Sequence, residues 1–292
     1  MEKDETKIGL FYGVATFVMW GIFPIYFKLL KDVDATEILA HRIFWSAIFV
    51  FLFIKFSNKM MSLKRYFLDR NVVFKLVLSG FFVAVNWGIY IYAVNSNQIL
   101  EASLGYFINP LMYIILGAIV FKEKPSTLGK ISIAIVVCAI LLQIFILGKI
   151  PFIAILLPAL FAIYGLIKKK LAVPSFEGLF IETFFWAIFA LIYIVFLQVK
   201  GSGSFGFNQI GFLLVISGIV TVAPLLTFNS AATKLKLSTI GYLQYISPTM
   251  TTLLAIFLYK EEFDVYRLIS FVMIWISLIL ITINGIKGAK SV

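Results

Sequence analysis

The sequence predicts an all-α integral membrane protein, and two observations carry that prediction. Of the 292 residues, 62% are hydrophobic and only 13% are charged, and the mean hydropathy is +1.03. A soluble chain of this size could not remove so much apolar surface from water, so its main solvent must be lipid. Apolar runs of about 20 residues, long enough to cross a hydrocarbon core as helices, recur along the whole chain. Such continuous runs exclude a membrane β-barrel, whose strands alternate over about ten residues.

The apolar runs predict ten membrane-spanning helices. The first follows a short charged tail and is too long for a signal peptide, so we expect it to be retained. The second precedes the longest connection, the basic stretch 56–71, and the seventh ends at the turn Gly201–Ser204. The other connections are short, and none could form a soluble domain. The expected spans, each placed to within about three residues, are 8–28, 36–55, 72–94, 99–121, 126–147, 151–168, 175–198, 208–232, 237–259 and 265–287.

Lys and Arg are unevenly distributed between the two sides of these expected helices. With the N-terminus inside, eighteen of the 25 Lys and Arg residues lie on the inner side and six on the outer side, while Arg42 lies within a helix. Because the inner loops of membrane proteins are enriched in positive charge, we expect both termini in the cytoplasm. The net charge of +11 is then a consequence of topology, and we expect no nucleic-acid partner.

Several kinds of chemistry are excluded by residues that the chain lacks. Cys138 is the only cysteine and His41 the only histidine, so neither an intrachain disulfide nor a common zinc ligand set can form. A glycine-rich phosphate loop followed by Lys and Ser or Thr is absent from the sequence. We therefore expect no metal, no cofactor and no ATP-driven motor within this chain.

The two halves of the chain are related by an internal repeat. The best matches keep a fixed spacing of twelve residues between a proline and a Lys-Glu pair, and they predict repeats 1–148 and 149–292 with five helices each. Because five is odd, the second repeat must enter the membrane from the opposite side, an arrangement typical of secondary transporters with a midplane site. A shift of 138 residues places Asn109-Pro110 on Ser247-Pro248, Phe121-Lys122-Glu123 on Tyr259-Lys260-Glu261 and Ser132 on Ser270, and a shift of 140 places Glu37 on Glu177.

Four segments of the first half carry a family resemblance. They are Trp20–Lys28, Glu37–Ser46, Asn86–Asn95 and Glu101–Pro110, the last containing the string Gly-Tyr-Phe-Ile-Asn-Pro. The sequence resembles the RarD proteins, which belong to the EamA family of the drug/metabolite transporter superfamily. The resemblance implies a ten-helix fold of two inverted EamA repeats in a bacterial inner membrane. It also implies a transporter, and relatives in the superfamily export amino acids or other small metabolites.

Ionisable residues inside the expected spans are candidate site residues, because a charge at bilayer depth usually faces a cavity or a partner. Glu37, His41 and Trp45 share one face of the second span, and Arg42 lies one position round. A shift of 140 residues places Arg42 on Glu182, so the inverted halves carry opposite charges at equivalent positions. The depths do not require a direct ion pair. Arg42 could instead contact helix carbonyls, and Glu182 could have a purely structural partner.

Aromatic and amide residues well inside their spans suit a cavity for an amphipathic or aromatic small molecule. Three prolines predict helix kinks that shape gating more than they contact substrate: Pro24, Pro110 and Pro248. Packing between helices through small and hydroxyl residues is the alternative. The expected cavity lining consists of Trp20, His41, Arg42, Trp45, Asn86, Tyr90, Tyr106, Asn109, Tyr164, Glu182 and Asn229.

The favoured function is a secondary transporter that exports a small organic metabolite, such as an amino acid or amphipathic compound, by alternating access around a midplane cavity. An uncoupled facilitator or channel and an intramembrane enzyme using His41 and Glu37 are the alternatives. Protons are the candidate coupling ion, since His41 titrates near neutral pH and Glu37 lies one turn away. Uncoupled diffusion stays equally open. Arg42 could hold an anionic substrate group such as a carboxylate. The expected partners are this substrate and the lipid bilayer, with the oligomeric state open.

Overall fold

A computed structural model describes residues 2–120, 122, 126–148, 150–169, 171, 173–232, 234–235 and 243–290. The elements found in these residues are helices, and no strand occurs among them. In chain order they are α1 (Glu2–Gly21), α2 (Phe23–Lys28), α3 (Ala35–Phe56), α4 (Met60–Phe67), α5 (Arg70–Asn95), α6 (Ile99–Val120), α7 (Thr127–Leu147), α8 (Phe152–Lys169), α9 (Ser175–Lys200), α10 (Gln209–Ala232), α12 (Ile246–Leu253), the π-helix η1 (Leu254–Leu258) and α13 (Val265–Lys290).

Apolar helices occupy the expected spans. Seven helices among the described residues are long and apolar enough to cross a membrane, and each overlaps one expected span. The remaining three expected spans contain shorter apolar helices, Phe152–Lys168, Ile246–Leu258 and Val265–Ile281. By length and composition seven spans are thus supported, and the full count of ten stays a prediction. Part of the expected ninth span, residues 236–242, lies outside the described residues.

Local sequence explains two departures from the expected pattern. The first span is divided at Ile22 into α1 and α2, and Pro24 stands in the first turn of α2. A proline there lacks the N–H that would continue the ladder, and its ring crowds the carbonyl one turn earlier. The basic connection 56–71 contains the short helix α4, which buries Leu63 and exposes its charged side chains. Pro110, in contrast, lies within a continuous α6, and Pro248 stands in the first turn of α12.

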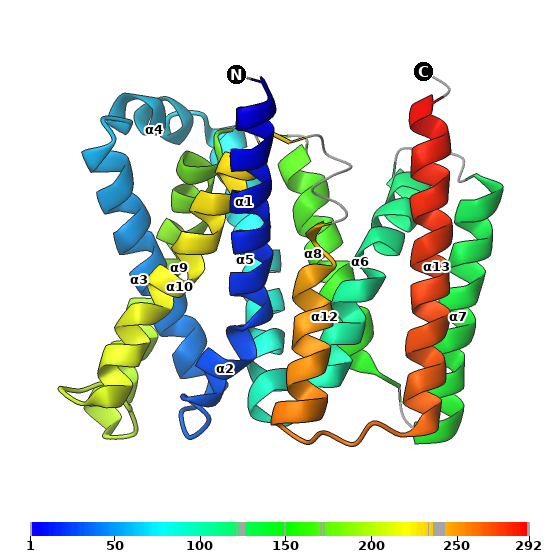
Figure 1. Cartoon of the computed structure of the whole chain (residues 1–292). Helices are drawn as coiled ribbons and strands as arrows, with labels where there is room; N and C mark the ends of the chain where they lie inside the picture. Colours follow the sequence, from blue (N-terminus) through cyan, green and yellow to red (C-terminus); the bar gives the residue numbers. More distant parts are fainter. Residues whose placement is uncertain are drawn as a thin grey trace.

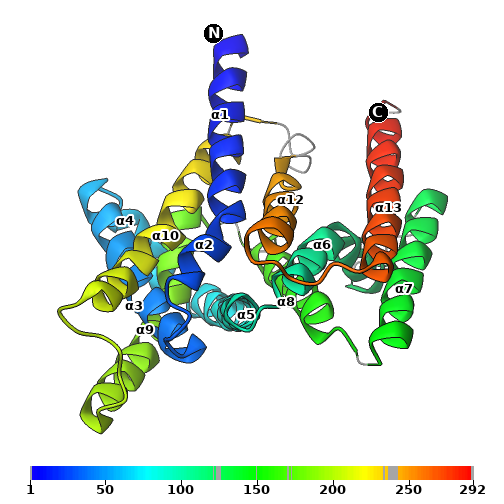
Figure 2. The ribbon, with the colours of Figure 1, turned by 60° about the horizontal axis from the view of Figure 1, so that its bottom comes forward.

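The helices form a bundle whose chain ends lie at the same end, where α4 also lies (Figure 1). On one side α3, α9 and α10 pack together, while α7 and α13 form a separate pair on the other side (Figure 2). Between them lie α5, α6, α8 and α12 (Figure 2). Many large apolar side chains point outward, among them Phe145, Phe189 and Val199. An outer surface of this kind suits contact with lipid.

Contacts between helices recur when the two halves are exchanged. Pairing the expected spans in order makes α1 with α2 equivalent to α8, α3 to α9, α5 to α10, α6 to α12 and α7 to α13. Three contacts join equivalent helices: α3 with α9, α6 with α12, and α7 with α13. Three others have an exchanged counterpart: α1–α10 matches α8–α5, α3–α10 matches α9–α5, and α6–α8 matches α12–α1.

The α7–α13 pair shows the same exchange at the level of single residues. Ser132 Oγ donates to the Ser277 carbonyl at 3.2 Å, and Ser277 Oγ donates to the Ser132 carbonyl at 3.1 Å. One stretch along the pair, Ser270 Oγ donates to the Ala139 carbonyl at 3.5 Å. A shift of 138 residues converts the pair 132 and 277 into 270 and 139. The spacing found in the sequence therefore relates two buried contacts of the structure.

Candidate functional site

Arg42 lies at the centre of the most unusual polar environment in the bundle. Its side chain is buried within α3, with 4% of the residue exposed. Nε donates to Thr221 Oγ1 of α10 at 2.7 Å, and this hydroxyl donates in turn to the Ser217 carbonyl at 2.9 Å. The guanidinium carbon lies 4.3 Å from the centre of the Trp87 ring of α5. Such an arrangement is a close cation–π contact, which partly compensates a desolvated cation.

Further aromatic rings surround the same guanidinium. Phe23 and Phe27 of α2 lie 5.6 and 5.5 Å from its central carbon. The hydroxyl groups of Tyr26, Tyr90 and Tyr106 lie close enough to interact with its charge. Among the described residues no carboxylate forms an ion pair with Arg42. Its positive charge is therefore met by rings and hydroxyl groups rather than by an anion of the protein.

Asn86 and two tyrosines form a polar network beside this ring cluster. Tyr106 donates to Asn86 Oδ1 at 3.3 Å, and Asn86 Nδ2 donates to the Leu157 carbonyl of α8 at 2.8 Å. The Tyr90 ring lies 5.6 Å from that of Tyr106 and 6.1 Å from that of Phe27. We call the whole group the Arg42 cluster; its members are Phe23, Phe27, Arg42, Asn86, Trp87, Tyr90, Tyr106 and Thr221. They come from α2, α3, α5, α6 and α10, so both halves of the chain contribute.

Glu182 belongs to a second polar cluster between α5, α8 and α9. Lys168 Nζ lies 2.9 Å from Glu182 Oε1, and Ser79 Oγ donates to the same oxygen at 3.0 Å. Tyr164 of α8 also interacts with this carboxylate, and the ammonium of Lys168 lies 5.9 Å from the Tyr164 ring. Lys168 therefore reaches inward to a buried anion, although its place at a helix end suggested a surface charge. The ion pair gives Glu182 a structural partner, and Arg42 is not that partner in the described contacts.

The comparisons with known proteins follow from this architecture. Residues 7–145 and 149–283 each match the EamA-like transporter family. The chain belongs to this family. It is 39% identical to "Uncharacterized transporter YojE" of Bacillus subtilis (strain 168), covering 100% of this chain and 99% of that one. It is 38% identical to "Protein RarD" of Escherichia coli (strain K12), covering 98% and 97%. The chain is thus a RarD-type EamA protein and a multi-pass membrane protein.

A solved structure supports the fold of this EamA protein. The chain titled "Crystal structure of protein" matches with a TM-score of 0.60 over 98% of each chain. Its sequence identity of 16% restricts that comparison to the fold. A further relative, "Chloramphenicol-sensitive protein RarD" of Pseudomonas aeruginosa, is 23% identical over 93% of this chain and 92% of its own length. The names of the relatives indicate transport, as the resemblance in the first four spans implied.

In this EamA chain, the expected coupling residues contact the α9–α10 connection. Glu37 accepts hydrogen bonds from Ser204 N at 2.7 Å and Ser204 Oγ at 2.9 Å. His41 accepts one at Nδ1 from Trp45 Nε1 at 3.2 Å, and its ring stacks on Phe205 with centres 4.8 Å apart. His41 Nε2 is buried and has no hydrogen-bond partner in the described structure. Neither a hydrogen bond nor an ion pair is described between Glu37 and His41, although the two share a helix face.

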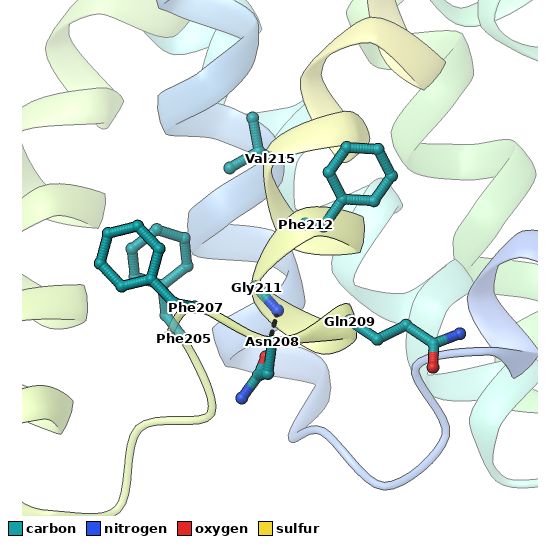
Figure 3. A pocket seen from close by; sticks show the side chains of 8 residues that line it. Phe205, Phe207, Asn208, Gln209, Gly211, Phe212 and Val215 are labelled. Atoms are coloured by element: carbon teal, nitrogen blue, oxygen red, sulfur yellow. Dashed lines mark hydrogen bonds between the residues drawn. The ribbon is translucent and has the colours of Figure 1, made fainter.

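The pocket in Figure 3 lies beside the same connection, at the end of the bundle opposite the chain termini (Figures 1 and 3). It has a volume of about 530 Å³. Asn208 Oδ1 accepts from Gly211 N at 2.7 Å within its wall, which caps the start of α10. No residue of the expected cavity lining belongs to this pocket, which is lined by Phe205, Gly206, Phe207, Asn208, Gln209, Gly211, Phe212 and Val215.

The structure therefore distributes the eleven expected lining residues over several places. Arg42, Asn86, Tyr90 and Tyr106 come together in the Arg42 cluster. Tyr164 and Glu182 belong to the second cluster, and His41 and Trp45 contact Phe205. Trp20 packs on Phe17 and Phe228, and Asn109 is buried with no partner for its side-chain oxygen among the described residues. The side chain of Asn229 lies outside the described residues.

Sequence reasoning left Trp87, Phe23, Phe27 and Thr221 out of the expected lining. Phe23 and Phe27 lie four residues apart, and Trp87 adjoins Asn86, so helical spacing offered a weak signal for these three. Thr221 offered none, because it lies 179 residues from Arg42 along the chain. Only the packing of α3 against α10 brings these two side chains together.

Proposed function

We propose that this chain is a secondary transporter that moves a small organic metabolite across a bacterial inner membrane by alternating access. In this proposal ten spans form two inverted repeats, residues 1–148 and 149–292. The exchangeable helix contacts support it, with the Ser132–Ser277 and Ala139–Ser270 contacts as the observation that carries it. Inverted repeats give a carrier two related conformations, each open to one side.

The substrate site of the proposal is the Arg42 cluster. Its residues come from both halves, and its charge is buried where a soluble core would avoid one. Rocking of one repeat against the other would expose such a site to each side in turn. We propose export of an amino acid or another amphipathic compound, in line with the aromatic lining and the polar network around Asn86.

Counterflow in proteoliposomes tests the transport function. Vesicles holding the purified full-length protein would be loaded with candidate metabolites and diluted into a trace of the same labelled compound. A carrier accumulates the label transiently and saturably, and empty vesicles do not. Flux that never saturates and shows no counterflow would favour a channel. Consumption of the compound without its movement would favour an intramembrane enzyme.

Orientation is part of the same proposal, with both termini in the cytoplasm. It is supported by the basic residues of α4, which lie at the same end of the bundle as the termini (Figure 1). Single cysteines at Ser57 and Ser202, two exposed serines at opposite ends, would test it in a Cys138→Ala background. An impermeant thiol reagent should label Ser202→Cys in intact cells and Ser57→Cys only after permeabilisation. The reverse pattern would refute the orientation.

We also propose proton coupling through His41, supported by its buried and unpartnered Nε2. An imposed pH gradient should change the initial rate or final accumulation of substrate for the native protein, and His41→Ala should lose that response while keeping counterflow. Equal transport by the native protein with and without the gradient would establish facilitated diffusion instead. Glu37 is bonded to Ser204, so Glu37→Gln should mainly disturb the α9–α10 connection.

A further inference from the structure

Arg42 keeps most of its hydrogen-bonding capacity unused. A guanidinium carries five N–H groups, one on Nε and four on its terminal nitrogens. Nε donates to Thr221 Oγ1. Among the described residues no acceptor for the terminal nitrogens is found, and the two described ion pairs belong to Lys168 with Glu182 and Lys234 with Glu5. A residue that is 96% buried thus has four strong donors without a protein acceptor in the part of the chain that the structure describes.

The orientation of the guanidinium is constrained from two directions. Trp87 lies over it at 4.3 Å, and Thr221 holds Nε from the opposite half of the chain. Stacking occupies the face of a planar guanidinium and leaves its N–H groups, which point outward in the plane, available. Two parallel N–H groups along one edge match the two oxygens of a carboxylate. The structure therefore presents a prepared bidentate donor rather than a mobile surface charge.

The surroundings select the charge of the ligand. Lys168 is the other cation described deep in this part of the bundle, and it is already neutralised by Glu182. One unpaired positive charge balances one negative charge, and a phosphate dianion would retain an excess charge in a water-poor site. A monoanion with a planar oxygen pair fits this environment better than a dianion.

The same surroundings select the body of the ligand. Phe23, Phe27 and Tyr90 provide apolar ring faces near the guanidinium. The Asn86–Tyr106 pair offers a small polar group beside them. Aromatic walls with few polar groups favour a compound with an aryl or compact alkyl body.

We propose that the Arg42 cluster binds the carboxylate of an amphipathic monoanion, with the apolar body of the ligand against the surrounding rings. The identification of this ligand as cargo rests on the proposed transport function, whereas binding itself does not. Trp87 would report occupancy, because a carboxylate bound to the guanidinium changes the charge directly over its indole.

The experiment compares two probes that differ in charge and share their ring and chain. Purified full-length protein in detergent would be titrated with 3-phenylpropanoate and with 3-phenylpropanamide, following tryptophan fluorescence and the thermal unfolding midpoint. We expect the acid to bind at least about tenfold more tightly than the amide. Arg42→Gln should abolish this preference, and Arg42→Lys should retain part of it. Arg65→Gln, which removes an exposed arginine of α4, should leave it unchanged.

Three results would overturn the inference: equal binding of acid and amide, binding of neither probe by the native protein, or an unchanged acid preference in Arg42→Gln. Should Arg42→Gln fail to fold, the acid–amide comparison in the native protein and a weakened acid preference in Thr221→Val test the same site. Arg42-dependent binding without counterflow would refute transport and leave the binding site standing. Counterflow of an uncharged metabolite that Arg42→Gln leaves unchanged would keep the transport function and refute the carboxylate site.

Discussion

The two buried charges at equivalent positions, Arg42 and Glu182, are stabilised in different ways. Arg42 is stacked on Trp87 and bonded to Thr221, whereas Glu182 is paired with Lys168 and Ser79. An arginine can spread its charge over ring faces, but a carboxylate is repelled by them and needs donors. This difference leaves the cation available to a ligand and makes the anion structural.

Removing Lys168 should destabilise the protein, because Glu182 would remain as an unpaired buried charge. Breaking a buried pair on one side costs about 3 to 5 kcal/mol, and Lys168 is partly exposed, so we expect about 3 kcal/mol for Lys168→Met. The thermal unfolding midpoint in detergent measures the effect. The double variant Lys168→Met/Glu182→Gln should recover part of the loss, and the exposed Lys64→Met should change little. Equal midpoints for the single and double variants would show that the pair is not stabilising.

At the scale of elements, α3 and α10 are held in backbone contact by a glycine. A Cβ added at Gly218 would lie 2.6 Å from the backbone carbonyl carbon of Trp45, a distance that requires the helices to separate. At Gly88 it would meet only a terminal methyl of Leu39 at 3.0 Å, which a rotamer change can relieve. Small residues permit this close approach in membrane bundles, where packing rather than water drives association.

Gly218→Ala should therefore disturb the Arg42–Thr221 contact, since both residues lie on the two helices that would separate. We expect a lower unfolding midpoint and reduced counterflow, while Gly88→Ala, with the same chemical change, stays close to the native protein. Both are measured in one detergent and one lipid mixture. Equal behaviour of the two alanine variants would mean that α10 can shift without cost.

Glu261 stabilises the start of α6 from the other half of the chain. Its two oxygens accept from Ile99 N at 2.7 Å and Leu100 N at 2.9 Å, which are unpaired first-turn donors of that helix. A carboxylate at this position also interacts favourably with the helix dipole. Glu261→Gln should cost about 1 kcal/mol of stability, because an amide offers one neutral oxygen in place of two charged ones. The adjacent Glu262, which is exposed, provides the matched control Glu262→Gln. If both variants lowered the unfolding midpoint equally, the cap would contribute nothing specific.

At the scale of the whole molecule, the exchange of halves makes a prediction about register. Cysteines at Ser132 and Ser277 should form a disulfide on mild oxidation in a Cys138→Ala background, and so should cysteines at Ala139 and Ser270. The mismatched pairs 132 with 270 and 139 with 277 use the same positions but lie about two helical turns out of register, roughly 10 Å apart. They should not cross-link. Efficient cross-linking of mismatched pairs would contradict the α7–α13 contact, and mobility on denaturing gels distinguishes the outcomes.

Hydropathy along the chain determined the helical segments, because lipid selects continuous apolar runs wherever they occur, independently of their neighbours. The seven spans that satisfy length and composition fall on expected ranges for that reason. Sequence also pointed to Arg42, Asn86, Tyr90 and Tyr106, since polar groups inside apolar runs stand out against their surroundings. It missed α4, whose polar face gives no apolar run.

Only the tertiary structure decided which of these groups meet. Thr221 is the partner of Arg42 and Lys168 that of Glu182, and His41 contacts Phe205 rather than the Arg42 cluster. Partner choice depends on helix rotation and register, which are determined by side-chain packing between segments far apart in the chain. Every helix here is apolar on most faces, so its sequence does not mark the face that a neighbour will cover, and the contact between α3 and α10 exists only once both have packed.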